Sequence, residues 1–118
     1  MKLLFVEDDP AQRLMFGTAL QRAGATVKVL SQYDALAVDW RNFDAILCDV
    51  MMADNDGPSL IHNAINLYAP LPPVFLFSAI ADELLSGEAQ SMGHGVQWIS
   101  KSIPIGSLLG EIRKRCAS

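Results

Sequence analysis

Residues 3–10 read LLFVEDDP, an apolar run that leads at once into three acidic residues and a proline. An apolar run without alternation is typical of a strand that is buried on both faces of a sheet. Asp9 followed by Pro10 is a favourable helix start, because the carboxylate can cap the first turn and proline fits the first helical position. The segment therefore predicts a buried strand followed directly by a helix.

Short apolar runs, most of them without alternation, recur at residues 27–30, 45–48, 74–77 and 96–99. The intervening segments carry apolar residues at helical spacing and end in glycine or proline. They predict five helices, at 10–23, within 31–44, at 58–68, at 82–92 and at 105–116. Alternating strands and helices predict a parallel sheet covered on both faces. The expected class is α/β and doubly wound, with one domain over residues 1–118.

The composition excludes several other classes of protein. The chain has 118 residues, of which 51% are hydrophobic, and its 13 acidic and 9 basic side chains give a net charge of −4. Without a basic stripe, direct nucleic-acid binding is disfavoured. No secretory signal is recognisable, and no apolar run approaches the roughly 20 residues that cross a bilayer. We expect a cytoplasmic protein without a membrane segment, in which Cys48 and Cys116 are reduced thiols.

Polar side chains follow four of the five predicted strands. Ligands of open parallel sheets bind beyond the carboxyl ends of the strands, so these residues are the candidate site. They are Glu7, Asp8 and Asp9 after the first strand, Asp49 after the third, Ser78 after the fourth and Lys101 after the fifth. Converging carboxylates repel one another unless a cation lies between them, and Mg²⁺ prefers oxygen ligands. Together the residues predict a magnesium-dependent phosphoryl-transfer site.

Each of these residues alone has a simpler explanation. The acidic residues 7–9 could serve only to cap a helix, Ser78 could belong to an ordinary turn, and Lys101 could be a surface lysine. Asp54 and Asp56 are assigned to a turn for the same reason. It is the coincidence of acid, hydroxyl and amine at one edge that favours a reactive site.

Four segments together resemble the receiver domains of two-component response regulators. The segments are LLFVEDDP (3–10), AILCDVMMADNDG (45–57), VFLFSA (74–79) and WISKS (98–102), in the order and spacing of that family. The resemblance covers nearly all of the chain. It implies a flavodoxin-like receiver fold, with five parallel strands in the order 2-1-3-4-5 and five helices.

The resemblance also implies a role for each candidate residue. Asp49 would be the phosphoacceptor, and Ser78 and Lys101 would contact the phosphoryl group. Trp98 would be the aromatic switch residue, following Ser78 when the latter moves toward the phosphoryl group. The resemblance implies a Mg²⁺ site formed by Glu7, Asp8, Asp49 and the backbone carbonyl of Met51.

The implied function is that of a signalling receiver and not of an enzyme, apart from its own phosphorylation and dephosphorylation. The implied phosphodonor is a sensor histidine kinase or a histidine phosphotransfer protein. The signal would pass by conformational change to an unknown downstream protein or to an output domain absent from this sequence. A homodimer is also expected from the resemblance.

Two positions depart from the family pattern. Ala53 and Ser102 stand where the family has prolines, and the second of these often follows a cis bond. A non-proline cis bond costs about 2.5–4 kcal/mol, which predicts a trans Lys101–Ser102 bond and a displaced lysine. The absence of these two prolines favours an alternative, a phosphorylation-independent pseudo-receiver that acts as a protein-binding module. An aspartate-dependent phosphohydrolase is disfavoured because Met51 stands where a second acid is needed.

Overall fold

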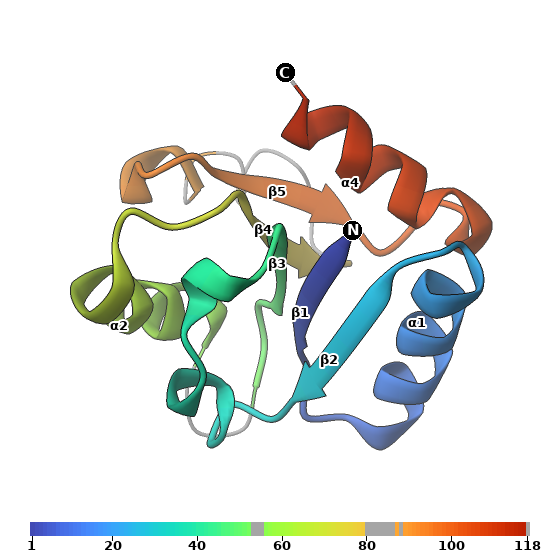
Figure 1. The fold of residues 1–118 in the computed structure, drawn as a ribbon, viewed down its shortest axis with the longest axis horizontal. Helices are drawn as coiled ribbons and strands as arrows, with labels where there is room; N and C mark the ends of the chain where they lie inside the picture. The colour runs from blue at the N-terminus through green and yellow to red at the C-terminus, as the bar shows by residue number, and fades with distance from the viewer. Residues whose placement is uncertain (53–55, 80–86, 88, 118) are drawn as a thin grey trace.

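The computed structural model describes residues 1–52, 56–79, 87 and 89–117. Its centre is a five-stranded sheet with the order β2-β1-β3-β4-β5, in which every pairing is parallel (Figure 1). The strands are β1 (Lys2–Val6), β2 (Thr26–Leu30), β3 (Ala45–Asp49), β4 (Val74–Ser78) and β5 (Val96–Ser100). Each contains one of the predicted apolar runs. The predicted α/β class and strand order are therefore confirmed.

Two of the α-helices, α1 and α2, begin at capping aspartates. They are α1 (Pro10–Arg22), α2 (Gly57–Tyr68) and α4 (Leu108–Cys116), with short 3-10 helices η1 (Ala35–Ala37), η2 (Trp40–Asn42) and η3 (Ile105–Ser107). Asp9 caps α1 by accepting a hydrogen bond from the Ala11 N–H at 3.0 Å. The predicted last helix is split, because its first three residues form η3. Of the helix predicted over 82–92, residues 87 and 89–92 are helical, and 82–86 and 88 lie outside the described residues.

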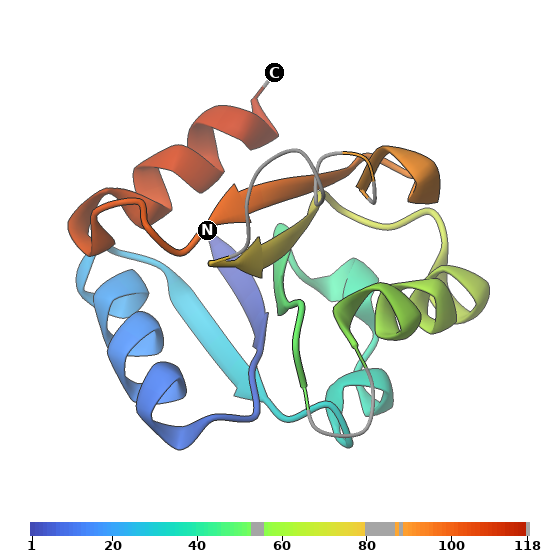
Figure 2. The same cartoon turned by 180° about the vertical axis from the view of Figure 1, so that it is seen from behind.

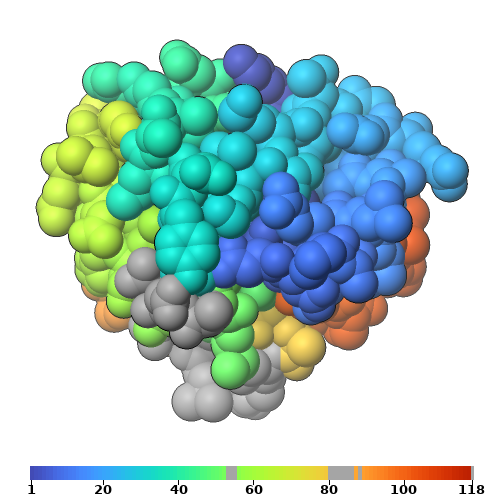
Figure 3. Space-filling view, turned by 90° about the horizontal axis from the view of Figure 1, so that it is seen from below, coloured from blue at the N-terminus to red at the C-terminus, as the bar shows by residue number. Residues whose placement is uncertain are grey.

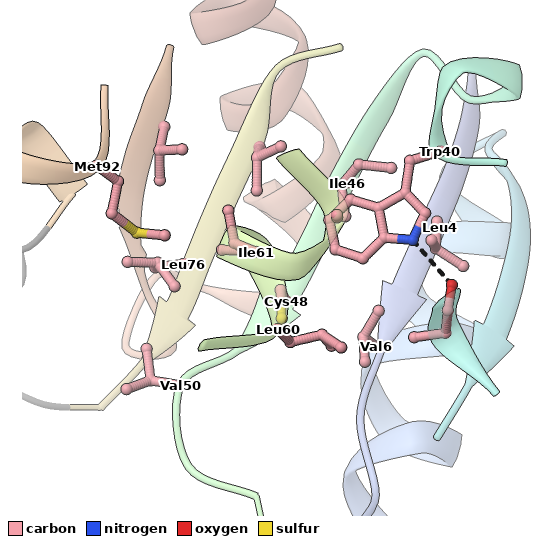
Figure 4. Packing of buried hydrophobic residues seen from close by; sticks show 14 of the residues in the cluster. Leu4, Val6, Trp40, Ile46, Cys48, Val50, Leu60, Ile61, Leu76 and Met92 are labelled. Atoms are coloured by element: carbon pink, nitrogen blue, oxygen red, sulfur yellow. Dashed lines mark hydrogen bonds between the residues drawn. The ribbon is translucent and has the colours of Figure 1, made fainter. Parts of the chain in front are cut away.

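The segment 31–44 differs from its prediction, since it forms η1 and η2 in place of one short α-helix. Val38 is extended between the two turns, and the Asp39 side chain accepts from the Arg41 N–H at 2.9 Å, which starts a new turn. The buried indole of Trp40 donates to the Ala35 carbonyl at 2.8 Å (Figure 4). These local hydrogen bonds satisfy the backbone without a continuous helix.

Helices cover both faces of the sheet, as Figures 1 and 2 show, with α1 and α4 on one face and α2 on the other. Along β1, Leu3 and Phe5 belong to the hydrophobic cluster that contains side chains of α1 and α4. Leu4 and Val6 belong to the opposite cluster, which contains Leu60 and other side chains of α2 (Figure 4). Because successive side chains of a strand point to opposite faces, a strand covered on both sides must be apolar throughout. This explains why the sequences of the central strands β1, β3 and β4 do not alternate.

The carboxyl ends of the strands lie at one edge of the parallel sheet. Figure 3 looks onto this edge, where the segments that follow β1, β2 and β3 lie next to one another in blue, cyan and green. The polar residues that follow the strands are therefore brought together by topology.

No helix in the described part of the chain has the length and apolar character needed to cross a membrane.

The start of α2 packs directly against the end of β3. The N–H of Gly57 donates to the Val50 carbonyl at 2.8 Å, and Asp56 caps α2 by accepting from the Ser59 N–H at 2.8 Å. A Cβ atom on Gly57 would lie 2.5 Å from the backbone oxygen of Asp49, closer than van der Waals contact permits. The chain can bring α2 this close to Asp49 only because residue 57 has no side chain.

We therefore expect Gly57→Ala to destabilise the protein by about 1–3 kcal/mol, because the ends of α2 and β3 must move apart. Gly110→Ala is the matched control, since a Cβ there meets no atom within 4 Å and alanine favours the helix. That variant should be more stable by about 0.5–1 kcal/mol. Urea unfolding of both variants measures the difference, and equal stabilities would contradict the assignment of Gly57.

Candidate functional site

Asp49, Glu7 and Lys101 form a buried charged group at the carboxyl edge of the sheet. Asp49 ends β3 and is 5% exposed, whereas Glu7 directly follows β1 and is 1% exposed. The ammonium group of Lys101 lies 2.8 Å from Asp49 Oδ1 and 3.7 Å from Glu7 Oε2. One cation therefore serves two carboxylates, which leaves the group with excess negative charge.

Lys101 is held by both its backbone and its side chain. Its peptide bond to Ser102 is trans, as predicted. Its N–H donates to the Ser78 carbonyl at 2.9 Å, which fixes it beside the end of β4. Its ammonium group also donates to Gln12 Oε1 and lies 5.4 Å from the centre of the Phe77 ring. The trans bond therefore does not prevent the lysine from reaching Asp49.

Glu7 is the residue of the site whose negative charge is most strongly disfavoured by burial. Its Oε1 accepts a hydrogen bond from the Asp9 N–H at 3.0 Å. Its Oε2 is buried and has no hydrogen-bond partner among the described residues. Burial raises the pKa of Glu7 to about 7, and the nearby charge of Asp49 also raises it, against the opposing effects of the Asp9 N–H and Lys101. A buried carboxylate in this position favours either a proton or an additional cation.

Asp8 faces a different partner from Glu7 and Asp49. Its Oδ1 accepts from the backbone N–H of Gln32 at 2.8 Å, and its Oδ2 accepts from the side-chain amide of the same residue. Within the described ranges, no three His, Cys, Asp or Glu side chains are placed together so as to hold a metal ion. Two of the three predicted acidic ligands thus lie together at Lys101, and the third is bound to Gln32.

The donor set of this edge nevertheless fits a hard divalent cation. Its carboxylate oxygens are the ligands that Mg²⁺ prefers, and Glu7 Oε2, which accepts no hydrogen bond from the described residues, is an acceptor that a cation can satisfy. Met51 is the second residue after β3 and is 72% exposed. Of the ligands named from the sequence, Glu7 and Asp49 lie together at this edge.

The remaining two predicted residues lie on neighbouring strands. Ser78 ends β4, is 4% exposed and pairs in register with Ser100 of β5. Trp98 lies on β5, two residues before Ser100, and packs against the hydrophobic cluster that contains side chains of α2. Its Nε1 is buried and finds no hydrogen-bond partner in the described part of the chain, while its carbonyl accepts from Arg115 at 2.5 Å. A cavity of about 250 Å³ adjoins it and is lined by Ala89, Gln90, Val96, Gln97, Trp98 and Arg115.

Sequence reasoning missed two amides that contact the site, Gln12 and Gln32. Gln12 lies in the first turn of α1, where its Nε2 donates to Asp9 at 3.3 Å and its Oε1 accepts from Lys101. Gln32 lies two residues beyond the end of β2. The rule that ligand contacts follow strand ends would have found Gln32 if it had been applied to the second strand as well.

Comparisons with known proteins agree with this architecture. A family model described as response regulator receiver domain matches residues 3–113. The BeF3-activated N-terminal receiver domain of Klebsiella pneumoniae RstA is 25% identical, with a TM-score of 0.83 and 100% of each chain covered. The receiver domain of the hybrid histidine kinase CckA is 26% identical, with a TM-score of 0.75 over 98% of this chain and 99% of the other.

A third solved structure bears on the fold alone. The Vibrio cholerae chemotaxis protein CheY4 is 24% identical, with a TM-score of 0.81 over 96% of each chain. A search of curated proteins finds no match.

Proposed function

Because the chain belongs to the response regulator receiver domain family, we propose that it accepts a phosphoryl group on Asp49 in two-component signalling. The observation that carries the proposal is the contact of 2.8 Å between Lys101 Nζ and Asp49 Oδ1, at a buried edge shared with Glu7. The Asp49 carboxylate can act as the nucleophile. The positive charge of Lys101 beside it can then stabilise the negative charge of an incoming phosphoryl group.

In the proposed reaction, a carboxylate oxygen of Asp49 attacks the phosphorus of a phosphohistidine. The donor is a sensor histidine kinase or a histidine phosphotransfer protein. The new O–P bond forms as the P–N bond breaks, and Asp49 becomes an acyl phosphate. Lys101 then pairs with the phosphoryl oxygens as a mobile point charge, and the hydroxyl of Ser78 donates to one of them.

Mg²⁺ would be held by Glu7, Asp8, Asp49 and the backbone carbonyl of Met51. When bound, it supplies positive charge that neutralises the carboxylates and the transferred phosphoryl group. The protein contributes the burial that makes these interactions strong, since Glu7 and Asp49 are both almost inaccessible to water.

The proposed output is a change in the position of Ser78 that the ring of Trp98 follows. Trp98 lines a pocket of about 250 Å³ together with Ala89, Gln90 and Arg115, so its ring is not enclosed on that side. The surface beyond it, formed by β5, α4 and residues 89–92, would contact a downstream protein, an output domain or a second copy of the chain. Two alternative positions of Ser78 and Trp98 would convert the added charge at Asp49 into a different shape of this surface.

A second candidate function is the phosphorylation-independent pseudo-receiver. It is favoured by the two hydrogen bonds that hold Asp8 on Gln32, away from Glu7 and Asp49. In this reading the fold is kept as a protein-binding module and the acidic edge carries no phosphoryl group.

Intact mass spectrometry after incubation with Mg²⁺ and acetyl phosphate separates the two functions. The receiver is expected to gain one phosphate-sized mass increase, which a chelator abolishes. A folded protein that gains no mass under these conditions would support the pseudo-receiver instead. Circular dichroism of the same sample confirms that the protein is folded.

A further inference from the structure

Both carboxylate oxygens of Asp8 are bound by one residue, Gln32. The backbone N–H of Gln32 donates to Oδ1 at 2.8 Å, and its side-chain amide donates to Oδ2. Gln32 is 3% exposed, and its two hydrogen bonds to Asp8 are partly buried. We propose that the Gln32 side chain competes with Mg²⁺ for Asp8 and thereby sets a weaker affinity for the ion. This inference rests on the proposed function, because it concerns one of the proposed ligands.

The competition follows from the strength of the contact. Hydrogen bonds to an ionised carboxylate are among the strongest in proteins, and they are strengthened further where water is excluded. When Asp8 turns to a metal ion, the side-chain amide of Gln32 loses its hydrogen bond to a charged acceptor, which is unfavourable. Binding of Mg²⁺ therefore has to supply the free energy lost at Gln32.

Gln32 could have the opposite effect if it oriented Asp8 for the ion, as partners of metal ligands often do. The geometry favours competition over orientation. Glu7 and Asp49 both face Lys101, whereas Asp8 is directed at Gln32, and no three acidic side chains converge within the described ranges. An orienting partner would be expected to direct Asp8 toward the other two carboxylates.

Gln32→Leu tests the proposal, because leucine keeps a similar volume and the backbone N–H but removes the amide. Titration calorimetry of the 118-residue protein with MgCl₂ should show a dissociation constant lower by about three- to tenfold. Gln21→Leu is the matched control, since it removes an exposed amide from α1 far along the helix from Asp9. It should leave the dissociation constant unchanged.

A dissociation constant that is unchanged or raised in Gln32→Leu overturns the inference, and a 10- to 100-fold rise would assign Gln32 the orienting role. Either result leaves the proposed function intact. Unmodified protein that binds no Mg²⁺ would overturn both the inference and the proposed function.

The unmodified protein provides a second test that does not depend on the variant folding. The side-chain amide resonances of Gln32 in ¹⁵N spectra should shift during a MgCl₂ titration, with the same midpoint as the calorimetric binding. Resonances that stay fixed while the ion binds would show that Asp8 is not released, and would overturn the proposal.

Discussion

Asp49→Asn is expected to abolish the phosphate-sized mass increase that Mg²⁺ and acetyl phosphate produce in the unmodified protein. The amide has nearly the shape of the carboxylate but no nucleophilic oxygen of comparable strength, so the acyl phosphate cannot form. It also removes the charged partner that lies 2.8 Å from Lys101. The expected effect is complete loss and not a slower reaction, because no other carboxylate makes such a close contact with Lys101 in the described part of the chain.

The matched control is Asp34→Asn, which changes an exposed aspartate that is not at the site. This variant should gain the same mass as the unmodified protein. Persistence of the mass increase in Asp49→Asn would show that another residue is the acceptor and would overturn the assignment of Asp49.

Glu7→Gln is expected to stabilise the metal-free protein at pH 8. Burial raises the pKa of Glu7 from 4.5 to about 7, so the folded protein holds a proton between these values that the unfolded chain has lost. The stability of the unmodified protein therefore falls as the pH rises through that window, and at pH 8 the loss is at most about 3 kcal/mol. Glutamine is neutral at every pH, so the stability of the variant does not fall in this window.

The pH dependence distinguishes this effect from ordinary repacking. Glu7→Gln and the unmodified protein should differ little near pH 4.5, and the variant should become the more stable one as the pH rises toward 8. Glu111→Gln is the matched control, because Glu111 is partly exposed and paired with Arg115, which lowers its pKa. It should show no stabilisation at pH 8.

Urea unfolding in the presence of a chelator measures these stabilities. With added Mg²⁺ the unmodified protein should become more stable than Glu7→Gln, since the ion stabilises only the protein that keeps the Glu7 carboxylate. A variant that is less stable than the unmodified protein at pH 8 without metal would contradict the electrostatic account of Glu7.

The fold could be predicted from the sequence to a large extent because local and long-range signals agree. The runs of the three central strands, β1, β3 and β4, lack alternation because both faces of these strands are covered. The Asp9–Pro10 pair starts α1 where capping chemistry requires it. The segment 31–44 was harder to predict. There the indole of Trp40 and the carboxylate of Asp39 form local hydrogen bonds that interrupt the helix, and helical spacing alone does not reveal them.

The candidate site was predictable only in outline. Parallel topology brings the strand ends together, and that rule identifies Glu7, Asp49 and Lys101 from the sequence. It does not determine that Asp8 turns toward Gln32, since this depends on the path of the loop after β2 and on side-chain rotamers. The trans bond before Ser102 followed from peptide energetics.

The most direct test of the account is to map the phosphorylated residue itself. An acyl phosphate on aspartate is reduced by borohydride to an alcohol, which leaves homoserine at that position and can be located by tandem mass spectrometry of peptides. After incubation with Mg²⁺ and acetyl phosphate, we predict homoserine at residue 49 and nowhere else, and none when a chelator is present. Reduction at another residue, or no reduction in the folded protein, would contradict the assignment of Asp49 as the phosphoacceptor.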